Sequence, residues 1–299
     1  MAFEVRWPQY HDGMRYSDKS DLNTLNICLP RSPTNDSKQL WIVYLHGGAW
    51  RDPAIDATSF NKTLHLLLSS PAIKHIAGLA SINYRLSPYP SHPHHPSKPG
   101  DPARNARHQD HIDDVLTAIG WLQRKYEFRS NYLLVGHSCG ATMALQVGMS
   151  RKWTNIKHDI APPAAIVGFE GIYDIPALVD RHSDQAIYEQ FITDAFGPDR
   201  EVWKAVSPVN GDYKRSWKDH KIAVLAHSRE DELVELEQVT SMQEVLEDQG
   251  FAQAEALIAE VKGKHDEIWQ DGTEMARVIA DTISLLVSEG RTTPPVLER

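Results

Sequence analysis

The chain has 299 residues, with 31 Lys and Arg against 40 Asp and Glu and a formal net charge of −9. Binding to nucleic-acid phosphates needs a local surplus of Lys and Arg, so we expect no nucleic-acid partner. Two cysteines are too few for a disulfide framework, and we expect a reducing compartment, the cytoplasm. The first residues lack the apolar stretch of a signal peptide, and no apolar run approaches the roughly 18 residues that span a bilayer. We therefore expect a soluble protein with no membrane partner.

Apolar runs alternate with helical patterns along the chain. Residues 40–45 are apolar, β-branched and aromatic, which predicts a strand buried on both faces. Residues 58–70 place apolar side chains at helical spacing, and a second strand is predicted over 76–84, so the three segments form a β-α-β unit. Further strands are predicted at 131–135, 164–168, 222–226 and 255–261, and further helices at 112–122, 141–149, 234–247 and 275–287.

Two segments interrupt this alternation. Residues 87–105 form a loop whose many prolines exclude both a helix and a central strand. Residues 172–217 are polar and aromatic, with room for several short helices. There is no internal repeat and no flexible Gly/Ser linker. We predict a single α/β domain over residues 1–299, built on one doubly wound, mostly parallel sheet with two lid-like excursions.

A Gly-x-Ser-x-Gly motif, Gly136-His-Ser-Cys-Gly140, lies between a predicted strand and a predicted helix. In a nucleophile elbow the serine occupies a strained turn, and flanking glycines let the strand and the helix approach each other. This context makes Ser138 a candidate nucleophile. The alternative is an ordinary Gly-rich turn with a capping serine.

A serine hydroxyl needs a base, usually a histidine held by a carboxylate, and elbow hydrolases place the acid and then the histidine after the serine. Of the 15 histidines, only His265 lies after residue 227, just past a predicted strand. Asp231 follows the strand at 222–226 and is the preferred acid, with Asp174 as its rival. The alternative for each is a surface histidine, a solvated loop charge or a helix cap.

The segment His46-Gly-Gly-Ala-Trp50 follows the first predicted strand. Acyl transfer develops negative charge on the carbonyl oxygen, which backbone N–H groups can stabilise. Gly47 and Gly48 let the main chain come close, so we expect the amides of Gly48, Ala49 and Cys139 to form an oxyanion hole. The Cys139 thiol is not the expected nucleophile, because the residue after an elbow serine contributes its amide. The alternative for the Gly-Gly pair is an ordinary turn.

A cluster of histidines and aspartates offers an alternative metal site. Prolines interrupt the cluster, and no established zinc-ligand spacing is present, so we expect no bound metal. Its members are His92, His94, His95, His108, His111, Asp110, Asp113 and Asp114.

Together these motifs resemble the α/β-hydrolase fold and, within it, the fungal kynurenine formamidases, which carry an HGGxW segment. The resemblance covers roughly residues 40–287, and neither the first 38 residues nor the Pro/His loop matches anything in it. The motifs are His46-Gly-Gly-Ala-Trp50 with Asp52-Pro53, Tyr84-Arg-Leu-Ser-Pro88, Gly136-His-Ser-x-Gly-Ala141, Gly171-Ile-Tyr173, His227-Ser-x-x-Asp-Glu-Leu233 and His265-Asp266.

The resemblance implies hydrolysis of N-formyl-L-kynurenine to L-kynurenine and formate, in the tryptophan catabolism that feeds NAD synthesis. It implies Ser138, Asp231 and His265 as the catalytic triad, a homodimer, a small-molecule substrate and no cofactor. Because the acyl group is only a formyl, we expect a tight pocket walled by Trp50, Phe169 and Tyr173. Two alternatives stay open, a general carboxylesterase that shares the same catalytic residues and a hydrolase-fold protein that only binds ligands.

Overall fold

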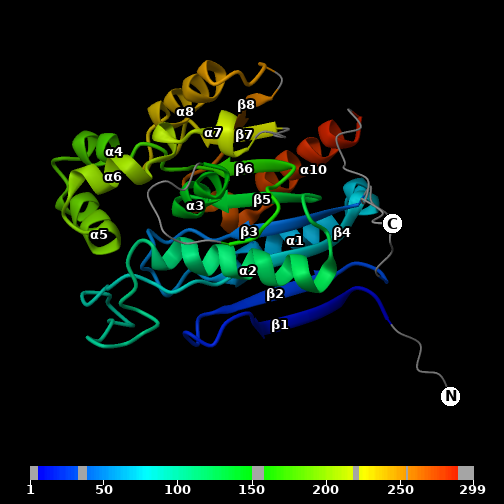
Figure 1. Cartoon of the computed structure of the whole chain (residues 1–299), viewed down its shortest axis with the longest axis horizontal. Coiled ribbons are helices and arrows are strands. Elements are labelled where there is room, and N and C mark those ends of the chain that lie inside the picture. The colour runs from blue at the N-terminus through cyan, green and yellow to red at the C-terminus, as the bar shows by residue number, and fades with distance from the viewer. Residues whose placement is uncertain (1–5, 33–38, 150–157, 218–221, 254, 289–299) are drawn as a thin grey trace.

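The computed structural model describes residues 6–32, 39–149, 158–217, 222–253 and 255–288. A central sheet of eight strands crosses the molecule in the order β1-β2-β4-β3-β5-β6-β7-β8 (Figure 1). The strands are β1 (Gln9–Arg15), β2 (Thr24–Leu29), β3 (Leu40–Leu45), β4 (Ile76–Ile82), β5 (Tyr132–His137), β6 (Ala165–Phe169), β7 (Ile222–Ser228) and β8 (Ala256–Val261).

The sheet is parallel from β4 to β8, and antiparallel only where β1 pairs with β2 and β2 with β4. Strands β3, β5, β6 and β7 are buried along their whole length, which explains their continuous apolar sequences. β3 and β4 pair in parallel, so the expected β-α-β unit is confirmed. β1 is mostly exposed, with polar residues at most of its positions, and this edge hairpin was not predicted.

Helices cover both faces of the sheet, which confirms the doubly wound architecture (Figure 1). α2, α3 and α8 pack on one apolar core, and α1, α9 and α10 pack on the other. The helices are α1 (Asn61–Leu68), α2 (Asp110–Tyr126), α3 (Cys139–Gly148), α4 (Ile175–Arg181), α5 (Ala186–Phe196), α6 (Arg200–Val206), α7 (Tyr213–Ser216), α8 (Glu237–Asp248), α9 (Glu267–Asp271) and α10 (Thr273–Ser288), with short 3₁₀ turns η1 (Ala57–Phe60), η2 (Pro71–His75) and η3 (Pro208–Asn210). Among these described helices, none has the length and apolar character needed to cross a membrane.

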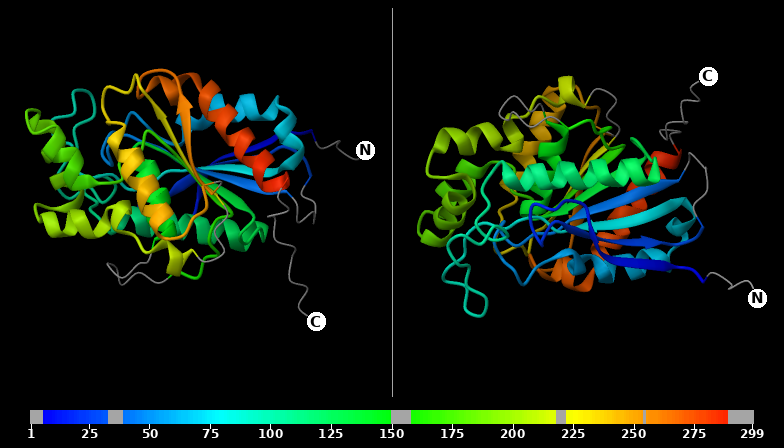
Figure 2. Two further views of the ribbon diagram at one scale, coloured as in Figure 1. Left: turned by 90° about the horizontal axis from the view of Figure 1, so that it is seen from above. Right: turned by 60° about the horizontal axis from the view of Figure 1, so that its bottom comes forward.

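The two predicted excursions lie at the same end of the molecule (Figure 2). Residues 87–105 contain no helix or strand, as their prolines predict, and the segment 172–217 forms α4 to α7. The backbone N–H of His108 donates to the carbonyl of Ala195 in α5 at 2.7 Å, which joins the chain that follows the first excursion to the second. Both excursions therefore lie beyond the carboxyl ends of the parallel strands, where ligands bind in sheets of this type.

Candidate active site

Ser138 occupies a tight turn between β5 and α3. Its backbone has φ 54° and ψ −125°, a conformation that is strained for a residue with a side chain. A Cβ atom on Gly136 would lie 2.3 Å from the carbonyl of Gly140, and one on Gly140 would lie 2.2 Å from the Leu45 carbonyl oxygen. Only glycines fit at these two positions, so the local geometry is that of a nucleophile elbow.

Asp231 and His265 form a hydrogen-bonded pair at the ends of β7 and β8. The Nδ1 atom of His265 donates to Oδ2 of Asp231 at 2.9 Å. The second carboxylate oxygen accepts the backbone N–H groups of Leu233 and Val234, at 2.8 and 3.0 Å. Burial opposes ionisation, but the hydrogen bond and charge of His265 outweigh it and hold the pKa of Asp231 well below its usual range. Asp231 is therefore an ionised acceptor that orients the imidazole.

Ser138 and His265 line one cavity of about 280 Å³. Aromatic side chains from both excursions, Tyr89, Tyr188 and Phe191, form part of its wall. The remaining lining residues are Gly48, Ala49, Arg51, Asp52, Ile55, Ile172, Gln185, Ile187, Leu233, Val234 and Asp266. The structure thus brings the predicted serine and histidine to one cavity, and residues of both candidate lids form part of its wall.

The His46-Gly-Gly-Ala-Trp50 loop follows β3 in an unusual backbone conformation. Gly48, Ala49 and Trp50 all have positive φ, at 93°, 49° and 59°. The hydroxyl of Tyr84 donates to the carbonyls of His46 and Gly47, at 2.9 and 3.2 Å, and so helps to fix the loop backbone. Both Gly48 and Ala49 line the cavity.

Gly47 approaches the elbow closely, because a Cβ atom there would lie 2.7 Å from Nδ1 of His137. Cys139 is the first residue of α3, so its amide is one of the N-terminal N–H groups without an acceptor inside the helix. Gly48 and Ala49 thus line the same cavity as Ser138, and Cys139 follows the serine at the start of α3.

The Cys139 thiol is buried and accepts a hydrogen bond. The backbone N–H of Trp50 donates to its sulfur at 3.3 Å, and the Tyr84 hydroxyl lies 3.6 Å away. Burial raises the pKa of this thiol to about 11. A protonated, enclosed thiol is a poor nucleophile, so the hydroxyl of Ser138 is the better candidate.

The aromatic residues expected to wall the pocket are not in its lining. Trp50, Phe169 and Tyr173 are at most 1% exposed. Trp50 packs against Phe191 and Phe196, with ring centroids 6.5 and 4.9 Å away. The expectation is corrected: the three rings are buried in the apolar cores and are absent from the cavity lining.

Asp174, the rival acid, is the N-cap of α4. Its side chain accepts the backbone N–H of Ala177 at 3.1 Å. This is the helix-cap alternative that the sequence left open, and it leaves Asp231 as the carboxylate bonded to His265.

Two aspartates and one histidine of the candidate metal cluster have partners within the protein. Arg85 binds Asp114 at 2.8 Å and Asp110 at 3.1 Å, which places a cation among the carboxylates. Nε2 of His111 lies 3.0 Å from the Ser87 hydroxyl, and burial lowers the pKa of this histidine to about 3. Within the described ranges, two sets of three side chains have ligand-type atoms close enough to share an ion, and neither set includes a residue of this cluster.

Three buried side chains near Asp231 and His265 were not predicted. Nε2 of His137 donates to the carbonyl of His265 at 2.9 Å, and burial lowers the pKa of His137 to about 3, so it acts as a neutral donor. His227 and Glu170 lie behind Asp231, with His227 Nδ1 2.8 Å from Glu170 Oε2. His137 and His227 lie at the carboxyl ends of β5 and β7, and this position is the one sequence feature that could have indicated their place near the site.

Glu170 follows β6 and is fully buried. Its Oε1 accepts the backbone N–H of Ser228 at 3.0 Å, and its carboxyl group is hydrogen-bonded to Asp231. Burial, followed by the negative charge of Asp231, raises the pKa of Glu170 to about 10. The two adjacent carboxyl groups thus carry one negative charge between them. Asp231 is ionised, and Glu170 stays protonated and donates a hydrogen bond to Asp231.

A Glu170→Gln variant should become more stable than the wild type as pH rises. The folded protein retains the Glu170 proton at pH values where the unfolded chain releases it, so this group costs stability increasingly between pH 4.5 and about 10. Glutamine can keep both hydrogen bonds without a titrating proton. The groups that face this carboxyl, Asp231, His227, Glu232 and Tyr173, are the same in both proteins.

Urea unfolding at several pH values between about 6 and 9 measures the effect. The free energy of unfolding should shift in favour of Glu170→Gln by on the order of 1 kcal/mol per pH unit. Glu244→Gln, the same change at an exposed site on α8, should follow the wild type. Parallel curves for Glu170→Gln and wild type would show that Glu170 is ionised in the folded protein.

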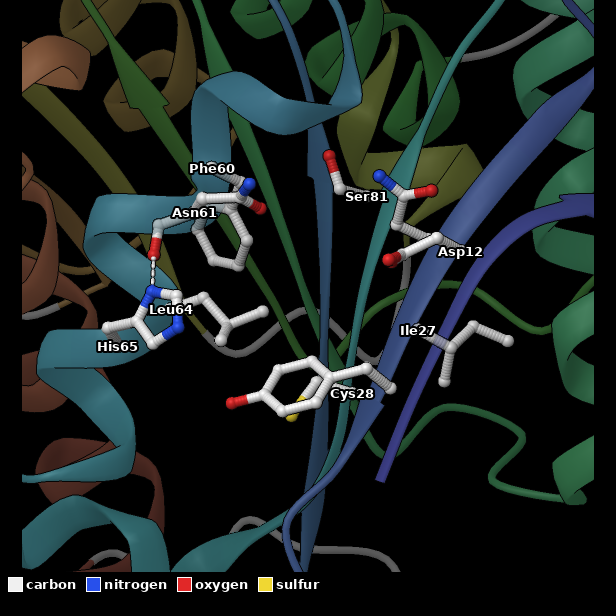
Figure 3. Close-up of a pocket in the computed structure, with 10 residues that line it drawn as sticks. Asp12, Ile27, Cys28, Phe60, Asn61, Leu64, His65 and Ser81 are labelled. Atoms are coloured by element: carbon white, nitrogen blue, oxygen red, sulfur yellow. Dashed lines mark hydrogen bonds between the residues drawn. The ribbon is translucent and has the colours of Figure 1, made fainter. Parts of the chain in front are cut away.

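A second cavity of about 280 Å³ lies between the β1–β2 hairpin and α1 (Figure 3). Its Ser81 hydroxyl donates to the Ala57 carbonyl at 2.7 Å, and Nδ1 of His65 donates to the Asn61 carbonyl at 2.6 Å. Burial and the charge of Asp12 raise the pKa of its Cys28 thiol to about 11. None of these groups is activated by another, so the cavity that contains Ser138 is the candidate active site.

Comparisons with known proteins agree with this assignment of the fold. A family model described as BD-FAE matches residues 25–246. The chain is similar to esterase B of Lactobacillus rhamnosis, with TM-score 0.68 and 16% identity, covering 96% of this chain and 89% of that one. A truncated carbohydrate esterase from gut microbiota has TM-score 0.63 and 19% identity, over 92% and 96% of the two chains. These likenesses confirm the α/β-hydrolase fold.

Curated relatives are more similar in sequence. A kynurenine formamidase-like hydrolase of Fusarium equiseti is 40% identical over 276 residues, which cover 90% of this chain and 92% of the relative. A kynurenine formamidase of Aspergillus versicolor is 36% identical, over 83% and 90% of the two chains. A kynurenine formamidase of Meyerozyma guilliermondii is 30% identical, over 88% and 90%.

Proposed function

The chain belongs to the kynurenine formamidase family of α/β-hydrolases, and we propose that it hydrolyses N-formyl-L-kynurenine to L-kynurenine and formate. The proposed setting is tryptophan catabolism leading to NAD synthesis. The observation that supports a serine-hydrolase mechanism is the hydrogen bond between an ionised Asp231 and His265, whose imidazole shares a cavity with Ser138 on its strained turn. The similarity to kynurenine formamidases carries the choice of substrate.

In the proposed first step, Nε2 of His265 takes the hydroxyl proton of Ser138 as the oxygen attacks the formyl carbon. The hydrogen bond from Nδ1 to Asp231 fixes the tautomer in which Nε2 is free to accept this proton. The ionised carboxylate also stabilises the imidazolium that forms.

The negative charge on the formyl oxygen would be stabilised by the amides of Gly48, Ala49 and Cys139. These donors are preorganised, because Tyr84 holds the loop carbonyls and the loop backbone is set by three successive positive φ values. Rigid donors need no reorganisation as the charge develops, and this is the main source of rate enhancement at such sites.

In the proposed second step, the C–N bond breaks and the imidazolium of His265 gives its proton to the departing nitrogen. An aniline nitrogen is far less basic than an alkyl amine, so esterase-type residues can expel it. Water then attacks the formyl ester on Ser138 while His265 accepts its proton. The bond from the formyl carbon to the serine oxygen breaks, His265 returns the proton to that oxygen, and formate leaves.

The substrate comparison tests this proposal. We expect kcat/KM for N-formyl-L-kynurenine to exceed that for p-nitrophenyl acetate by about 100-fold or more, because binding of the aryl and amino-acid portions is used in the transition state. Both reactions can be followed by absorbance with the same purified protein. A preference for the simple ester would contradict the formamidase proposal and favour a general carboxylesterase, and turnover of neither would favour a binding protein.

A further inference from the structure

The cavity that contains Ser138 also contains a buried cation. The side chain of Arg51 is 4% exposed and lies directly after the His46-Gly-Gly-Ala-Trp50 loop. Its guanidinium stacks over the ring of Tyr89, with Cζ 4.1 Å from the ring centroid. Burying a guanidinium costs free energy unless other groups compensate its charge and accept its hydrogen bonds.

The protein itself compensates this charge only in part. Nη1 of Arg51 lies 3.3 Å from a carboxylate oxygen of Asp194 in α5, and Asp194 is about one quarter exposed. Across the described ranges this is the one hydrogen bond that the guanidinium makes, although it has five N–H donors. The other guanidinium nitrogens are not sealed inside the protein, and Arg51 lines the cavity. The remaining N–H donors are therefore open to the cavity.

A planar guanidinium with unused donors matches a carboxylate, which accepts two parallel hydrogen bonds. Arg51 is the one lysine or arginine among the described residues that line the cavity. Asp52, the next residue, also lines it. Its Oδ1 accepts the backbone N–H of Ala54 at 2.8 Å and lies 3.4 Å from Nε2 of His92, and its Oδ2 offers an acceptor for an ammonium group. The cavity lining therefore includes a cation and an anion, which can complement the two charges of an α-amino acid.

We infer that Arg51 binds the α-carboxylate of the substrate, so that the cavity selects aryl formamides with an α-amino-acid tail over aryl formamides without one. This inference rests on the proposed function. Tyr89 and α5 hold the guanidinium in place, and the carboxylate completes the neutralisation that Asp194 begins. Arg51 thus determines specificity for the amino-acid end of the substrate, away from the formyl group that reacts.

Two substrates and two variants test the inference. One substrate is N-formyl-L-kynurenine, and the other is its decarboxylated analogue, N-formylkynuramine, which keeps the aryl formamide and the amine. In Arg51→Gln, kcat/KM for N-formyl-L-kynurenine should fall about 10- to 100-fold, mainly through KM, because a charge-assisted bidentate contact is lost. Turnover of the analogue should change less than about 3-fold, which also shows that the variant is folded.

Asp194→Asn is the matched control, because it breaks the ion pair but leaves the guanidinium. If Arg51 only held α5 in place, both variants would lose activity on both substrates, and the inference would be wrong. Equal wild-type turnover of the two substrates would also overturn it. Failure of the proposed function gives a different result, in which the wild type prefers p-nitrophenyl acetate to both formamides.

Discussion

Replacing Ser138 with alanine should lower kcat/KM for N-formyl-L-kynurenine by about 10⁴-fold or more. The reason is local: the hydroxyl sits on a strained turn that points it into the cavity shared with His265. No other candidate nucleophile in the described lining is activated, and the neighbouring thiol of Cys139 is enclosed, hydrogen-bonded and protonated. Alanine keeps the backbone and the oxyanion donors, so the loss should appear in kcat while substrate binding persists.

Steady-state kinetics and a thermal unfolding midpoint, measured on the same preparation, distinguish lost chemistry from lost folding. Ser284→Ala, on an exposed face of α10, removes the same hydroxyl elsewhere and should behave as the wild type. Turnover that persists in Ser138→Ala at more than about a hundredth of the wild-type rate would rule out a serine nucleophile.

The site residues that could be predicted are those that directly follow parallel strands. β5, β7 and β8 end at the same edge of the sheet, so residues just beyond their ends must converge. A strand buried on both faces is a continuous apolar run that is easily recognised. Ser138, Asp231 and His265 could therefore be selected from the Gly-x-Ser-x-Gly motif, their positions after such strands and their order in the chain.

The residues that sequence analysis missed depend on contacts between distant segments. Glu170 follows a strand and resembles an ordinary loop charge, and only the approach of Ser228 and Asp231 shows that it is buried and protonated. Arg51 resembles a solvated loop cation until Tyr89 and α5 are placed around it. Burial of a charge is decided by packing between segments that are distant in the sequence, and no local sequence pattern records it.

The error over Trp50 has the same origin. An aromatic residue in such a loop is a reasonable cavity wall, but the Trp50 ring is buried and packs against Phe196 in the core. The edge strand β1 was missed for a different reason. β1 is largely exposed and polar, so the apolar signal used for the other strands is absent there.

An Asp231→Asn variant should lose about 10³- to 10⁴-fold in kcat on N-formyl-L-kynurenine while remaining folded. In the wild type, one oxygen of Asp231 accepts the amides of Leu233 and Val234, and the other accepts the proton of His265 Nδ1. In asparagine the carbonyl oxygen must serve the two amides, so the NH₂ group faces His265. The imidazole then carries its proton on Nε2, the atom that must accept the proton of Ser138.

Asp174→Asn is the matched control, with the same change of charge at the rival acid. Asparagine caps helices as well as aspartate does, so its oxygen can still accept the N–H of Ala177 and the activity should change less than about 3-fold. Unfolding midpoints of both variants exclude a loss of structure. A large loss in Asp174→Asn with a small one in Asp231→Asn would reassign the acid. If both retained activity, no single carboxylate would orient His265, and the tautomer argument for this site would be wrong.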